Sequence, residues 1–229
     1  MLSKTLNSEK LFYNTYLYKL HVRTPLSHLM KSHPTRGVTY TALNTLKALM
    51  GNNDAIKVGR FKSATRTQME DCEKTLDRLK GKQSEFKLRC ELYSLIVYSN
   101  NLKLLEEIAQ DTSVDTPCIL WAPVPGSESF LSGNINTIVS KKPVKYEYKV
   151  TLKYGSSATH KAALATWIKN NPDKAKAGPV VLRNLEIDYY VGGNYFYVKN
   201  TSCLSIIEMI IGSGINKIEK VVYINDIDK

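Results

Sequence analysis

Residues 144–154 have the sequence VKYEYKVTLKY, which alternates strictly between apolar or aromatic residues and polar ones. Successive side chains of a strand point to opposite faces of its sheet, so this period of two predicts a half-buried β-strand. The face expected to meet the core carries Tyr146, Tyr148, Val150 and Leu152. The opposite face carries Lys149, Thr151 and Lys153.

The residues after this strand continue the pattern of a small α/β unit. The sequence predicts a helix over 159–170, strands over 180–191 and 195–199 joined by the turn at 192–194, a helix over 204–211 and a strand over 217–224. The order is βαββαβ, the split βαβ arrangement. Residues 144–226 therefore resemble the ferredoxin-like fold, which includes the RNA-recognition-motif family. The stretch GNYFYV at 193–198 is similar to the glycine and aromatic residues of that family's third strand.

This resemblance implies that the first and third strands lie side by side at the centre of the sheet. Phe196 and Val198 are then expected to face the core, and the outward face would combine Tyr195, Tyr197 and Lys199 with Lys149 and Lys153. Exposed rings among ammonium groups are typical of single-strand platforms, where rings stack on bases and lysines meet phosphates. In the alternative, this face packs on the helical region or on a second subunit of a homo-oligomer.

The N-terminal part of the chain is predicted to be mainly helical. Helices are expected over 6–22, 24–31, 39–50, 64–80 and 84–105, the last divided near Asn100 and Asn101. Proline, glycine and serine then mark an irregular segment over 111–143, with a short strand at 118–121. The expected fold is α+β, with a basic helical domain at 1–110, a linker at 111–143 and the plait at 144–229.

The positive charge of the chain lies mostly in its first third. Of the formal net charge of +11, residues 1–68 contribute +9, from eleven Lys and Arg against Glu9 and Asp54. A basic region this lopsided is typical of proteins that bind a polyanion. The phosphate contacts expected here come from Arg23, Lys31, Arg36, Lys57, Arg60, Lys62 and Arg66.

Several classes of protein are excluded by simple features of the sequence. No apolar run approaches the ~20 residues that span a bilayer, and the N-terminus lacks the apolar core of a signal peptide. Four widely spaced cysteines fit neither a disulfide framework nor a zinc module. We therefore expect a soluble intracellular protein with no membrane partner. Its basic, Tyr- and Asn-rich composition is similar to that of nucleic-acid-binding proteins of large bacteriophages, which implies the cytoplasm of a host cell.

The sequence favours a protein without chemistry of its own that binds RNA or other single-stranded nucleic acid, with no cofactor and no metal. Three alternatives stay open. Glu186 and Asp188 would share one face of the strand predicted at 180–191, where they could hold Mg²⁺ in a nuclease. Residues 39–79 could form a helix-turn-helix that binds duplex DNA, although acidic residues fall on its second helix. An assembly protein would instead use the sheet face as a protein interface.

Overall fold

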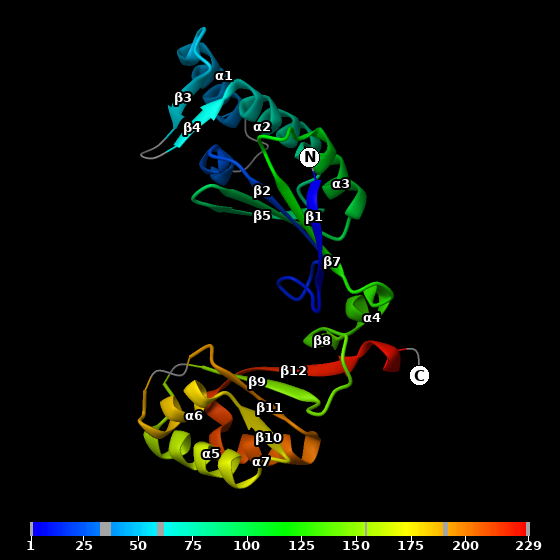
Figure 1. Cartoon of the computed structure of the whole chain (residues 1–229), viewed down its shortest axis with the longest axis vertical. Helices are drawn as coiled ribbons and strands as arrows, with labels where there is room; N and C mark the ends of the chain where they lie inside the picture. The colour runs from blue at the N-terminus through cyan, green and yellow to red at the C-terminus, as the bar shows by residue number, and fades with distance from the viewer. Residues whose placement is uncertain (1, 33–37, 59–61, 154, 190–191, 228–229) are drawn as a thin grey trace. The chain divides into compact units, whose positions relative to one another are not determined.

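The structure is a computed structural model that describes residues 2–32, 38–58, 62–153, 155–189 and 192–227. It divides into two compact units, Met1–Glu128 and Ser129–Lys229. Each unit is built on its own five-stranded mixed sheet (Figure 1). Within the described ranges, no helix has the length and apolar composition needed to cross a bilayer.

The first unit begins with strands, so the prediction of an N-terminal helical domain is wrong. Its sheet has the order β1 (Leu2–Ser8), β7 (Cys118–Pro123), β2 (Tyr18–Arg23), β6 (Ser94–Ser99) and β5 (Phe86–Glu91). Strands β1 and β7 run parallel, whereas the other neighbouring pairs are antiparallel. The short strand expected at 118–121 is present as β7, between β1 and β2.

The mistaken helices arose from apolar residues whose spacing fits both periods. In β2, Leu20 and Val22 are buried whereas the residues between and beside them are not, which is the period of two of a half-buried strand. The helix predicted over 84–105 is a hairpin of β5 and β6 followed by α3 (Leu102–Asp111). Asn101 caps that helix by accepting a hydrogen bond from the Leu104 amide. The two asparagines therefore mark a helix start and not a kink.

The remaining elements of the first unit lie over one face of this sheet or connect the elements that do. They are η1 (Ser27–Ser32), α1 (Val38–Met50), the hairpin of β3 (Ala55–Val58) and β4 (Lys62–Thr65), and α2 (Arg66–Leu79). A capping box between Thr65 and Gln68 begins α2. One hydrophobic core joins these elements with α3 and the inner sides of the strands (Figure 1).

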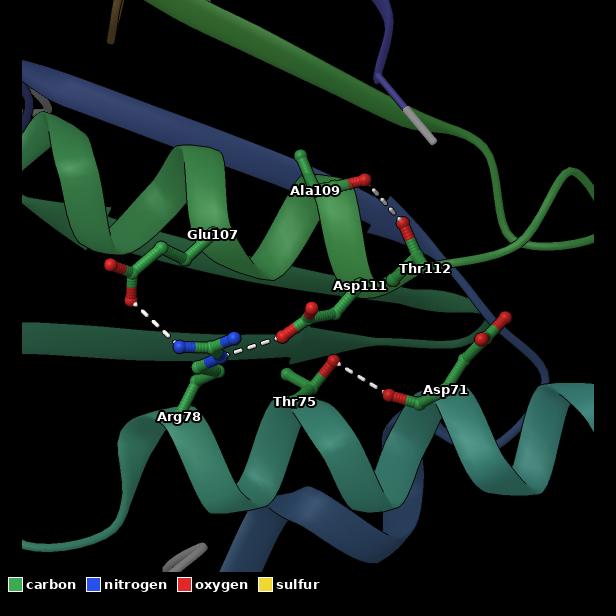
Figure 2. Close-up of polar contacts among 7 residues, drawn as sticks. All are labelled: Asp71, Thr75, Arg78, Glu107, Ala109, Asp111 and Thr112. Atoms are coloured by element: carbon green, nitrogen blue, oxygen red, sulfur yellow. Dashed lines mark hydrogen bonds and ion pairs between the residues drawn. The ribbon is translucent and has the colours of Figure 1, made fainter.

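Helices α2 and α3 are also tied by polar contacts at their surface. The Arg78 guanidinium donates from Nε to Asp111 at 2.6 Å and from Nη1 to Glu107 at 3.1 Å (Figure 2). Asp71, only 2% exposed, accepts hydrogen bonds from the Ser113 amide at 3.1 Å and the Ser113 hydroxyl at 2.6 Å. These contacts fix the segment that leads from α3 into β7.

The second unit corrects the predicted βαββαβ plait in two ways. Its sheet has the order β10 (Ala175–Ala177), β11 (Tyr195–Val198), β9 (Tyr148–Leu152), β12 (Ile215–Tyr223) and β8 (Thr137–Ser140). The fifth strand, β8, runs parallel to β12 and lies in the segment expected to be a linker. The strand predicted over 180–191 is the helix α6 (Pro179–Glu186), so the expected element order is wrong.

A local signal explains this helix. Gly178 stands at the N-cap and Pro179 at the first helical position, where the fixed φ of proline favours a helix start. The β-branched Val180 and Val181 had suggested a strand, but tertiary context routinely overrides so weak a propensity.

The other helices of the second unit are α4 (Glu128–Gly133), which begins at the division, α5 (Ala158–Asn170) and α7 (Thr201–Ile211), with the short turns η2 (Gly212–Gly214) and η3 (Ile224–Asp226). Helices α5 and α7 pack against Val150, Leu152, Phe196 and Val198 in one core. The predicted inward parity of β9 and β11 is thereby confirmed.

Candidate nucleic-acid interface

The face of the second sheet opposite α5 and α7 gathers lysines and tyrosines. In the register of the sheet, Tyr197 lies opposite Lys149 on β9 and Lys176 on β10, and Tyr195 lies opposite Thr151. Strand β12 adds Lys217 beside Thr151 and Glu219 beside Lys149. We call this surface the Tyr195 face; it comprises Lys149, Thr151, Lys176, Tyr195, Tyr197, Lys217 and Glu219. The neighbouring strands predicted from sequence are therefore present as β9 and β11.

The rings of this face are in contact with each other and with a cation. The ring centroids of Tyr195 and Tyr197 are 5.7 Å apart with planes at 83°, an edge-to-face pair. The Lys149 ammonium lies 4.0 Å from the centroid of the Tyr195 ring, within cation–π range. Tyr195 is 45% exposed, so a large part of its ring surface is open to a ligand. Lys153 and Lys199 continue the outward parity beyond the two strands and are both exposed.

One carboxylate lies among these cations. Glu219 is 2% exposed, and its Oε1 accepts a hydrogen bond from the Lys217 ammonium at 2.9 Å. A buried carboxylate with a lysine partner neutralises part of the local charge and holds the lysine in place. The Tyr195 face nevertheless carries three lysines against one acid, so it keeps a net positive charge.

The basic residues predicted in the first third of the chain are not gathered in one place. Lys57 and Lys62 are exposed on the β3–β4 hairpin, and the Lys62 ammonium lies 5.3 Å from the ring centroid of Tyr93. Arg66 donates to the Gly51 carbonyl at 2.7 Å, which engages part of its guanidinium at the start of α2. Arg23 is exposed at the end of β2. Arg36 and Arg60 lie outside the described residues, as does the Lys31 side chain.

The structure changes the premises of two alternatives, the nuclease that holds Mg²⁺ and the helix-turn-helix that binds duplex DNA. Glu186 ends α6 and forms an ion pair with Lys169, whereas Asp188, in a left-handed conformation after the helix, pairs with Lys161 at 2.8 Å. The strand that would have placed both carboxylates on one face is absent. Among the described residues, no three His, Cys, Asp or Glu side chains form a group that could hold a metal ion. The connection between α1 and α2 is the β3–β4 hairpin, not the short turn of a helix-turn-helix.

The structure also brings together a second set of rings and cations that the sequence analysis missed. On the face of the first sheet opposite its core, one row across the strands reads Leu6, Trp121, Lys19, Tyr98 and Lys87, and the next reads Lys4, Ile119, His21, Ile96 and Arg89. We call these ten residues the Trp121 face. The signal that could have revealed it is the alternation KLHVR at 19–23 and KLR at 87–89, in which every polar position carries a basic or titratable side chain.

Burial shifts the pKa of two residues on the Trp121 face. It lowers the pKa of His21 below its ordinary value of 6.5, and the neighbouring charge of Lys19 acts in the same direction. Burial likewise lowers the pKa of Lys19. The Nε2 atom of His21 is buried and has no hydrogen-bond partner among the described residues.

Comparisons of the chain with protein-family models, with curated proteins and with solved structures find no match. What the two faces can bind therefore follows from their own side chains. Both place aromatic rings beside ammonium or guanidinium groups on the side of a sheet opposite its core.

Proposed function

We propose that the protein binds single-stranded nucleic acid, with RNA preferred, and that the Tyr195 face is its binding surface, without chemistry of its own. The observation that carries this proposal is the register of β9 and β11, which sets Lys149 beside Tyr197 and brings its ammonium over the Tyr195 ring. Bases and phosphates alternate along a strand of nucleic acid. A surface on which rings and ammonium groups lie side by side matches that alternation.

The chemistry of the face favours unpaired bases. A base that stacks on Tyr195 must present its flat face, which bases in a duplex hide between their neighbours. Base–aromatic stacking contributes about 1–3 kcal/mol per base, and it tolerates any sequence because every base has such a face. The proposed binding is therefore selective for strand state and weakly selective for sequence.

Phosphate contacts add a part that does not depend on the bases. Lys176, Lys199 and Lys153 are exposed around the Tyr195 face, and Lys57 and Lys62 are exposed on the β3–β4 hairpin. Each phosphate that a lysine neutralises releases condensed counterions, so affinity from these contacts falls as salt is raised. We also propose that the protein acts inside the cell, as expected from the sequence.

The test compares the variant Tyr195→Ala/Tyr197→Ala with the unmodified protein. We expect fluorescence anisotropy with a labelled oligo(U) of about 10 nucleotides to show a loss of roughly 1–3 kcal/mol per lost stack. Tyr189→Ala is the matched control, because Tyr189 is 62% exposed and lies outside the face. Binding of a duplex of equal length should change little.

Two results would contradict the proposal. Full oligo(U) affinity in a folded double variant would remove the Tyr195 face from the site. Dissociation of an oligomer by the same double change, seen by light scattering, would show that the tyrosines form a protein interface.

A further inference from the structure

The Trp121 face has the composition of a binding surface in its own right. Its cations are Lys4, Lys19, Lys87 and Arg89. One acid, Glu91, lies next to them on β5 and forms an ion pair with Arg89 at 2.6 Å, so the cations remain in excess. The helices of the first unit pack against the other side of the sheet, where they form the core. Charge complementarity therefore points to a polyanion as the occupant.

The rings and cations of this face are interleaved and not segregated. In the row through Trp121, β2 contributes Lys19, β6 contributes Tyr98, which is only 6% exposed, and β5 contributes Lys87. The Lys19 ammonium lies 3.6 Å from the centroid of the Trp121 ring, and the Lys87 ammonium lies 3.8 Å from that of Tyr13. A simple anion would need the cations alone, whereas a nucleotide strand supplies a base for each ring and a phosphate for each cation.

Tyr13 is presented to this surface in a conformation that costs energy. It has a φ of 55°, in the left-handed region that bulky residues rarely adopt, and its side chain is 47% exposed. Its ring meets Tyr98 edge-on, with centroids 4.9 Å apart. A hydrogen bond from Arg89 lowers the pKa of Tyr13. Strained residues of this kind persist where the surrounding structure holds them, and they cluster at functional sites.

The Asn100 side chain ties the loop that carries Tyr13 to the end of β6. The Asn100 carboxamide accepts from the Leu17 amide at 2.8 Å and donates to the Thr15 carbonyl at 3.1 Å. Phe12 and Tyr16 pair across the turn by two backbone hydrogen bonds. The position of the Tyr13 ring beside the sheet is therefore set in advance, which lowers the ordering cost of a stacked complex.

We infer that the Trp121 face is a second, separate site for single-stranded nucleic acid, in which Trp121 and Tyr13 take bases and Lys19, Lys87 and Arg89 take phosphates. The site belongs to the first unit and uses no residue of the Tyr195 face, so it stands or falls independently of the function proposed above. Sheets of comparable width stack about two or three bases on their aromatic residues, which is the occupancy expected here.

In the variant Trp167→Phe, tryptophan fluorescence of the full chain reports on this face alone. The chain has two tryptophans, Trp121 and Trp167, and Trp167 packs at the core of the second unit. In the variant Trp167→Phe, we expect oligo(U) of about 10 nucleotides to quench the Trp121 emission, because a base stacked on the indole ring quenches its fluorescence. Heparin, a polyanion without bases, should compete for the site but should not reproduce the quenching.

Charge removal tests the same site by a second readout. Lys87→Ala/Arg89→Ala should weaken oligo(U) binding at the quenching site by about tenfold, since two phosphate contacts are lost. The matched control is Lys74→Ala/Lys80→Ala, which removes two exposed charges from α2 and should change affinity by less than about twofold. The variant Tyr195→Ala/Tyr197→Ala should leave the quenching constant unaltered.

The outcomes separate the two sites. Oligo(U) that binds by anisotropy but leaves Trp121 emission unchanged would overturn this inference and leave the Tyr195 face untouched. Equal quenching by heparin would reduce the face to a general polyanion surface and would also overturn it. If Trp167→Phe impairs folding, the exposed Tyr13→Ala variant replaces it, with a loss of affinity at low salt as the expected result and full affinity as the contrary one.

Discussion

The assignment of the two faces of β11 can be tested by changing three consecutive residues one at a time. Phe196 is 0% exposed in the core, whereas Tyr195 is 45% exposed on the opposite face. Phe196→Ala removes a fully buried ring and leaves a cavity, so it should lower the free energy of unfolding by about 3–5 kcal/mol. Tyr195→Ala removes a ring whose burial is only partial, so it should cost less than about 1.5 kcal/mol.

Binding should show the reverse order of effects. Tyr195→Ala should weaken oligo(U) binding by about 1–3 kcal/mol, which is roughly 5- to 150-fold in Kd. Phe196→Ala should leave the affinity per folded molecule unchanged, because its side chain points to the helices. Tyr197→Ala, on the parity of Tyr195, should behave as Tyr195→Ala does in binding.

The assay is urea unfolding followed by circular dichroism, paired with anisotropy under conditions where each variant is folded. A slip of the strand by one residue would exchange its two faces and with them every expected effect. If Tyr195→Ala lost as much stability as Phe196→Ala and kept its affinity, both the register and the platform would be refuted.

Three further predictions concern salt, pH and a buried carboxylate. Lys57→Ala/Lys62→Ala should flatten the logarithmic salt dependence of oligo(U) binding by up to about 1.4 units, measured by anisotropy, and an unchanged slope would exclude the hairpin. Because burial lowers the pKa of His21, the unfolded chain binds more protons below pH 6.5, so stability should fall on acidification. His21→Gln should reduce that fall between about pH 7 and pH 5 in urea titrations, and an identical fall would rule out His21 as the cause. Asp71→Ala should cost about 1–3 kcal/mol of stability, since it leaves the Ser113 donors without their acceptor, and a neutral result would refute that role.

Long elements with one clear period could be predicted from the sequence. The helices α1, α2, α5 and α7 lie where their periodic apolar residues placed them, to within a few residues at each end. The parity of β9 was also correct, because the alternation at 148–152 has no helical counterpart. What these elements share is a pattern that fits only one period.

The strands of the first unit could not be recognised in the same way, for a physical reason. Leu88, Leu92 and Leu95 recur at the i, i+4 and i+7 spacing of a helix, yet Leu92 lies 85% exposed in the hairpin turn. Pairing between distant segments decided the outcome: β7 lies between β1 and β2, about a hundred residues away in the chain. Such pairing depends on tertiary context, which a local propensity does not contain.

Once the apolar residues of a strand are assigned to the core, the residues on its outward face are the ones that can contact a ligand. In β9 and β11 the outward positions hold Lys149, Tyr195 and Tyr197, and in β2 they hold Lys19 and His21. A strand that needed only solubility would be served by Glu, Thr, Ser or Lys in any mixture. Aromatic residues also favour strands for packing reasons, so the rings alone do not decide the function. The proposed function rests on their recurrence beside cations on two sheets, an arrangement that matches a ligand with both flat bases and phosphates.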